Sequence, residues 1–124
     1  MTTGWKLDRA EREALLARFP PRWPDADADH VTLWSRTSGQ AHAPPPDPAS
    51  AAIVGHVDDG VGLEAMVVRL NGTIDRPDGS VFHITWSLDT AAGRRPVESN
   101  TVLREQGWTA WDEAVPITLT GARW

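Results

Sequence analysis

The pattern histidine, any residue, threonine occurs twice in this chain, each time in a short apolar run. One copy begins HVTLW at His30 and the other begins HITWS at His83. In a β-strand, residues two apart point to the same side, so His30 and Thr32 share one face while the apolar residues between them face the core. His83 and Thr85 obey the same rule. The repeat therefore predicts two equivalent strands that bring two histidine and threonine pairs onto a common surface.

Two other segments have helical patterns. In LDRAEREALLARF the apolar residues form one stripe, Asp8 and Glu11 have capping-box spacing, and the prolines after Phe19 end the helix there. A second helix, within VESNTVLREQGW, begins at Pro96 and ends near Gly107. We expect these two main helices and no strand before the first one.

Further apolar runs predict strands: AAIVGHV from Ala51, LEAMVVRL from Leu63, SVFHITWSL from Ser80 and VPITLTGARW from Val115. The second and third are joined by the turn-forming DRPDG and predict a hairpin with a long loop. By contrast, AHAPPPDPAS has four prolines in five positions and predicts a loop or disordered connector. A chain of 124 residues fits one domain, so we expect a single α+β domain over 1–124 with antiparallel sheets.

Charge and composition restrict the function classes. The net charge of −5 opposes binding to duplex DNA, which depends on basic faces that release counterions. The absence of cysteine excludes disulfides and thiolate sites, and no apolar run approaches the roughly 20 residues of a membrane helix. The start of the chain lacks the apolar segment of a secretory signal. We expect a cytoplasmic protein that does not bind membranes.

Two histidines facing one another suit phosphoester chemistry. A neutral imidazole can take a proton from water while an imidazolium protonates the departing oxygen. Threonine hydroxyls can donate to the phosphate held between them. We therefore expect His30 and His83 to be catalytic, and Thr32 and Thr85 to bind phosphate. Two more residues have the strand parity of the first pair and are candidate substrate contacts: Trp34, which could stack on a base, and Arg36, which could contact phosphate.

The motifs HVTL and HITW resemble those of the two-histidine (2H) phosphoesterase superfamily, which has a LigT-like fold of two pseudo-symmetric lobes around a groove. Within it, the contexts HVTLWSR, FHITWSL and RPVESNTVL resemble the cyclic phosphodiesterase domain of fungal-type tRNA ligases. The resemblance implies opening of a 2′,3′-cyclic phosphate without metal or cofactor, giving a 2′-phosphate in the ligase case. It assigns the acid and base roles to the histidine pair and phosphate binding to the threonine pair. Superfamily members begin with a strand, so we expect a trimmed version here.

The substrate implied is an RNA end or a cyclic nucleotide, with an ADP-ribose cyclic phosphate also open, and an RNA kinase or ligase as a functional partner. A non-catalytic module that binds a phosphorylated nucleotide or RNA end is the main alternative. A structural or partner-binding domain would instead have both histidine and threonine pairs buried and apart. A zinc site of His30, His56 and His83 is a further alternative without motif support. His42, among prolines, and His56, before a probable turn, have no expected catalytic role.

Overall fold

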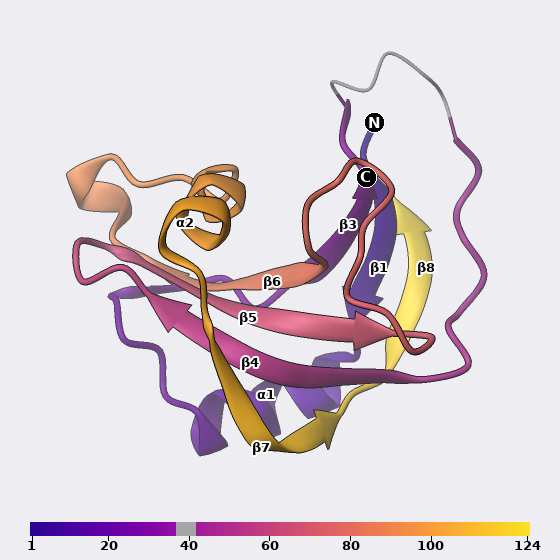
Figure 1. The fold of residues 1–124 in the computed structure, drawn as a ribbon, viewed down its shortest axis with the longest axis horizontal. Helices are drawn as coiled ribbons and strands as arrows, with labels where there is room; N and C mark the ends of the chain where they lie inside the picture. Colours follow the sequence, from indigo (N-terminus) through magenta and orange to yellow (C-terminus); the bar gives the residue numbers. More distant parts are fainter. Residues whose placement is uncertain (37–41) are drawn as a thin grey trace.

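Two antiparallel sheets organise the fold, which we describe from a computed structural model over residues 1–36 and 42–124 (Figure 1). The first sheet has the order β3-β1-β8. Its strands are β1 (Thr3–Leu7), β3 (His30–Trp34) and β8 (Leu119–Arg123). The second sheet has the order β2-β6-β5-β4-β7. Its strands are β2 (Asp25–Ala26), β4 (Ala51–Asp58), β5 (Leu63–Leu70), β6 (His83–Leu88) and β7 (Thr109–Pro116). β3 and β6 come from different sheets and pack against each other.

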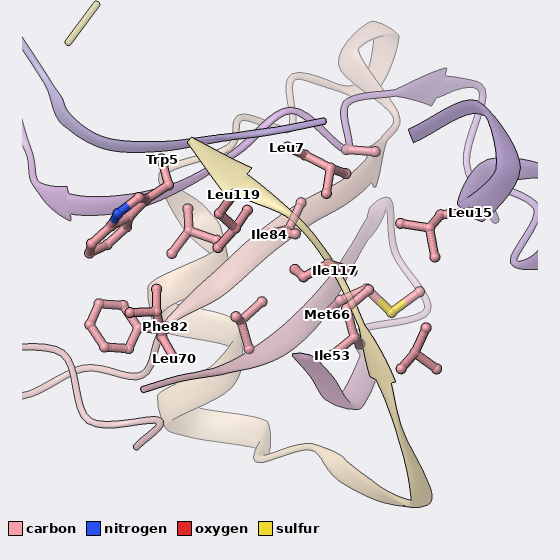
Figure 2. Close-up of a cluster of buried hydrophobic side chains, with 14 of the residues drawn as sticks. Trp5, Leu7, Leu15, Ile53, Met66, Leu70, Phe82, Ile84, Ile117 and Leu119 are labelled. Carbon is pink, nitrogen blue, oxygen red and sulfur yellow. The ribbon is translucent and has the colours of Figure 1, made fainter. Parts of the chain in front are cut away.

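Two α-helices and one short 3-10 helix complete the described part: α1 (Arg9–Arg18), α2 (Glu98–Gln106) and η2 (Thr90–Ala92). α1 packs with the first sheet against one face of the second sheet. Figure 2 shows this larger apolar cluster, in which Trp5, Leu15 and Ile84 come from β1, α1 and β6. α2 covers the opposite face, where Val102 and Leu103 pack on β4, β5 and β6. The second sheet is therefore buried on both faces, and its strand β5 is almost continuously apolar.

Much of the element pattern was expected from the sequence. The two helices end at Arg18 and Gln106, next to the predicted limits. The hairpin of β5 and β6 is confirmed by antiparallel pairing, with Val67 opposite His83. Residues 42–50 of the proline-rich segment contain no helix or strand, as expected, whereas its first residue lies outside the described residues. The coarse prediction of an α+β chain with antiparallel sheets and two main helices is therefore confirmed.

The expectation that no strand precedes the first helix is wrong. β1 lies at the centre of the first sheet, between β3 and β8, and its residues Thr3 and Leu7 are each 1% exposed. Only Trp5, Lys6 and Leu7 alternate between apolar and polar in TGWKL, which is too short a signal to predict a strand. The burial of the segment comes from neighbours distant in the chain on both sides. The trimmed architecture that we inferred from a missing strand is therefore withdrawn.

Three smaller differences concern strand and helix ends. β2 was not anticipated, and the last apolar run divides between β7, which begins at Thr109, and β8. The capping box is only half formed, because the Asp8 carboxylate accepts from the Glu11 amide at 3.0 Å but the amide of Asp8 donates to the Thr118 carbonyl instead. The Glu11 carboxylate accepts from the Thr118 amide, so it ties α1 to the start of β8.

Candidate functional site

A cavity of about 300 Å³ lies where β3 and β6 pack together, and both histidine and threonine pairs line it. The first pair is presented by an edge strand of the first sheet and the second by an inner strand of the second sheet. The prediction that the two pairs share a surface is met by this placement. Besides these four, the lining includes Thr2, Ser35, Arg36, Arg76, Pro96, Val97, Asn100 and Trp124.

His83 is held by the backbone of the residues just before its strand. Its Nδ1 lies 2.9 Å from the Val81 carbonyl oxygen, and because a carbonyl can only accept, Nδ1 must donate. In the neutral ring this leaves the lone pair on Nε2. Burial, together with the positive charges of Arg76 and His30, lowers the pKa of His83 to about 4, against the raising effects of the Val81 carbonyl bond and the Asp78 charge. His83 is therefore neutral at neutral pH, as a proton acceptor needs to be.

His30 is held by a carboxylate instead. Its Nδ1 lies 3.0 Å from Asp29 Oδ2, and its side chain is 25% exposed. The Trp124 ring lies beside the imidazole, with 4.7 Å between ring centroids and a tilt of 56°. A carboxylate at Nδ1 orients the ring and fixes which nitrogen faces the cavity. The two imidazoles are thus placed in opposite electrostatic surroundings.

The two threonines also differ in their surroundings. Thr85 is 7% exposed, and its hydroxyl lies 2.8 Å from the Ser99 hydroxyl and 3.4 Å from the Pro96 carbonyl oxygen. Thr32 lies on β3 and is partly exposed. Next to Ser99, the side-chain oxygen of Asn100 is buried and has no hydrogen-bond partner among the described residues. Asn100, in the first turn of α2, lines the cavity and was not assigned to the site by sequence analysis.

Arg76 is the basic residue that sequence analysis missed. It lies in the loop between β5 and β6, within the DRPDG turn, and is only 6% exposed. Its Nε donates to the Leu33 carbonyl at 3.2 Å, and its guanidinium lies 3.5 Å from the Asp78 carboxylate. Burial lowers its pKa and Asp78 opposes that effect, but an arginine keeps its charge in proteins. The β5–β6 loop thus places a fixed cation at the cavity, where Arg36 adds a second, exposed one.

Trp34 does not line the cavity. The register of β3 against β1 jumps between Thr32 and Trp34, so the alternation of faces that starts at His30 is broken there. The Trp34 ring stacks on His42 at 4.9 Å between centroids. An aromatic side chain does reach the cavity, but it is Trp124, which follows β8 and was not anticipated.

The other two histidines lie elsewhere. His42 is engaged by Trp34, and His56 lies on β4, before the bend at 60–62, with Nε2 2.8 Å from the buried Glu64 carboxylate. His56 lines a different cavity, together with Asp58 and Trp108. Within residues 1–36 and 42–124, no three histidine or acidic side chains are grouped so that they could hold a metal ion. The three-histidine zinc site considered above is therefore not assembled.

The remaining findings concern the chain as a whole. In the part that the structure describes, no helix is both long enough and apolar enough to cross a membrane. Comparisons with protein-family models, curated proteins and solved structures found no match to this chain. Functional interpretation therefore depends on the cavity itself: two imidazoles with opposite surroundings, two hydroxyls and a buried cation. Such a set can bind an anion and move protons on either side of it.

Proposed function

We propose that this chain is a metal-independent phosphodiesterase of the two-histidine type, which opens a 2′,3′-cyclic phosphate at an RNA end or on a nucleotide. The observation that supports the proposal is the gathering of His30, Thr32, His83 and Thr85 around one cavity from two different sheets. This arrangement fits the groove between two lobes that the resemblance to 2H phosphoesterases implies. A purely structural role would not need both pairs open to one cavity.

In this proposal His83 is the general base. Its Nδ1 proton is engaged by the Val81 carbonyl, so Nε2 offers a lone pair. Because burial keeps its pKa near 4, the ring is free of a proton across the neutral range. Nε2 takes a proton from water as the water oxygen attacks phosphorus.

His30 is then the general acid. Backed by the Asp29 carboxylate, its imidazolium gives the Nε2 proton to the ribose oxygen as the bond from that oxygen to phosphorus breaks. The products are a phosphate monoester and a free ribose hydroxyl. The proton gained by His83 and the proton lost by His30 are exchanged with solvent, so no other reactant is needed. Breaking the bond between phosphorus and the 3′-oxygen gives a 2′-phosphate, the outcome that the resemblance to fungal-type tRNA ligases implies.

The phosphate is stabilised by the groups between the two rings. Hydroxyls of Thr32 and Thr85 donate to its oxygens, and Arg76 supplies a positive charge that is already desolvated and held by backbone. Fixed donors and charges of this kind stabilise the transition state because they need no reorganisation during reaction. Arg36 is a further phosphate contact at the exposed side of the cavity.

The test is hydrolysis of nucleoside 2′,3′-cyclic monophosphates, and of a short RNA with that terminus, in the presence of a chelator. We expect turnover by the wild type and loss in His30→Ala and His83→Ala. Chromatography of the products against 2′- and 3′-monophosphate standards identifies the bond that breaks. Tight binding of the cyclic nucleotide with no turnover at any pH contradicts the enzyme and supports the non-catalytic binding module.

A further inference from the structure

Beside the cavity, the Asp29 carboxylate contacts three side chains, those of Lys6, Arg9 and His30. Its Oδ2 lies 3.0 Å from His30 Nδ1 and accepts from Lys6 Nζ at 2.5 Å. Its Oδ1 accepts from the Arg9 guanidinium at 3.0 Å, and Arg9 also donates to the Asp29 carbonyl at 2.9 Å. Both oxygens of the carboxylate are therefore engaged from separate directions.

The contacts come from three different elements. Lys6 belongs to β1, Arg9 opens α1, and Asp29 directly precedes β3. Asp27, in the loop before β3, is a second carboxylate whose charge interacts with those of Asp29 and His30. Because Lys6 and Arg9 both hold the Asp29 carboxylate, it cannot rotate away from the imidazole. The fold therefore fixes the direction of its hydrogen bond to His30.

The charge state of Asp29 agrees with this geometry. Burial alone would raise the pKa of the carboxyl, but hydrogen bonds from Lys6, His30 and Arg9 outweigh it and hold that pKa well below its usual range. Asp29 is thus an anion at every pH at which the protein would be assayed. It accepts the Nδ1 proton and does not supply one.

We propose that Asp29, clamped by Lys6 and Arg9, is a positioning residue that fixes His30 with Nδ1 on the carboxylate and Nε2 toward the cavity, in the form that donates a proton. This inference rests on the proposed function and extends it, because it explains why one of two identical motifs serves as acid. Trp124 completes the support: its ring lies against His30, and Lys6 Nζ lies 4.5 Å from the Trp124 ring centroid.

A second histidine and carboxylate pair provides the matched control. His56 Nε2 lies 2.8 Å from Glu64 Oε2, while the other Glu64 oxygen accepts from the Ser87 hydroxyl and the Arg22 amide. This pair lies outside the cavity and ties the 20–24 segment to the second sheet. Replacing either acid by its amide removes one charge next to one histidine, but only one of the two histidines would be catalytic.

The first experiment compares Asp29→Asn, Asp29→Glu and Glu64→Gln in the cyclic phosphate assay over a range of pH. For Asp29→Asn we expect kcat to fall about 10–100-fold, the usual effect of losing such a supporting partner, with KM nearly unchanged. The alkaline limb of the pH–rate profile of Asp29→Asn should move to lower pH. Asp29→Glu should bring that limb part of the way back toward the wild-type position. Glu64→Gln should lower the melting temperature but keep the pH profile. If Asp29→Asn keeps both the wild-type kcat and the wild-type pH–rate profile, the inference is wrong.

A second readout does not depend on activity. Long-range ¹H–¹⁵N spectra at alkaline pH report which ring nitrogen carries the proton. We expect Nδ1–H for His30 in the wild type and in Glu64→Gln, and a mixture of tautomers in Asp29→Ala. If no cyclic phosphate is opened but the spectra change in this way, the proposed function fails while the positioning of His30 stands. If the spectra of Asp29→Ala match the wild type, the inference itself is wrong.

Discussion

The two strands that carry the histidine and threonine pattern are alike in sequence and unlike in surroundings. β3 is an edge strand, and its His30 is hydrogen-bonded to the Asp29 carboxylate. That carboxylate also forms ion pairs with Lys6 and Arg9. β6 is an inner strand, and its His83 donates a hydrogen bond to the Val81 carbonyl. The positive charges of Arg76 and His30 act on this ring. One imidazole therefore has a carboxylate at its Nδ1, and the other has a neutral backbone carbonyl there.

The difference teaches that a repeated motif does not imply repeated chemistry. The alternation of strand residues is enough to bring the four side chains to one cavity. What each imidazole then does depends on the atom that faces its Nδ1, which comes from the residues just before the motif: Asp29 for His30 and Val81 for His83. Acid and base roles, which the sequence left open, follow from this asymmetry in our proposal.

The largest expected effect is loss of either histidine. His30→Ala and His83→Ala should each lower kcat on a cyclic phosphate by about 10²–10⁴-fold, the usual contribution of a positioned acid or base. The double variant should lose less than the product of the two single losses, because the pair acts as a unit. Steady-state kinetics on nucleoside 2′,3′-cyclic monophosphates measures all three.

A change of leaving group would sharpen the comparison between the two rings. On a 4-nitrophenyl phosphodiester the phenolate departs without being protonated, so His30→Ala should lose much less activity than on the cyclic substrate. His83→Ala should lose as much on both, because attack by water still needs a base. The opposite pattern would exchange the two roles.

The threonines should show a smaller effect that again differs between strands. Thr32→Val and Thr85→Val should each lower kcat/KM, with a cost of at most about 2–4 kcal/mol per lost phosphate donor. Thr85→Val should also destabilise the fold by about 1 kcal/mol, because the Ser99 hydroxyl loses its partner in a buried position. Urea unfolding separates the two effects, and equal stability of both variants would contradict the difference in burial.

The next effect concerns the backbone that positions β3. A Cβ on Gly4 would lie 2.1 Å from the Val31 carbonyl oxygen, at the point where the β1 and β3 register jumps. Gly4→Ala should therefore cost about 1–3 kcal/mol of stability and lower kcat by displacing the first pair. Gly60→Ala is the control: nothing lies within 4 Å of its Cβ, although its φ is +75°, so it should cost about 1 kcal/mol and leave kcat unchanged. Normal kcat in a folded Gly4→Ala variant would show that this contact does not set the site.

Sequence reasoning succeeded where the signal is local. The start of α1 at Asp8, its end near Phe19 and the shared face of His30 and Thr32 all follow from residues within a few positions of one another. Each depends on a period or a cap that a short window contains. The candidate site residues on both motifs were found for the same reason.

The features it missed are set by distant contacts. Lys6 meets Asp29 across 23 residues and Arg76 meets Leu33 across 43, and no window of sequence contains either contact. The register jump that turns Trp34 away depends on β1, a strand that the sequence did not reveal. One available signal was overlooked: an acidic residue directly before His30.

The smallest expected effect is a shift of the acidic limb of the rate profile. If His83 is the base, kcat/KM falls when this ring becomes protonated, and because its pKa is lowered to about 4 from an ordinary value of 6.5, activity should persist down to about pH 4. The charge of Arg76 contributes to that lowering, so Arg76→Gln should raise the pKa of His83 and move the limb to higher pH. Arg76→Lys keeps a positive charge and should move it less, although both variants weaken phosphate binding.

The measurement is kcat/KM from pH 3.5 to 8, with circular dichroism at each pH to confirm that the chain stays folded. A limb near the ordinary histidine value in the wild type, or no movement in Arg76→Gln, would mean that β6 does not hold its histidine in the buried, positively charged surroundings that distinguish it from β3.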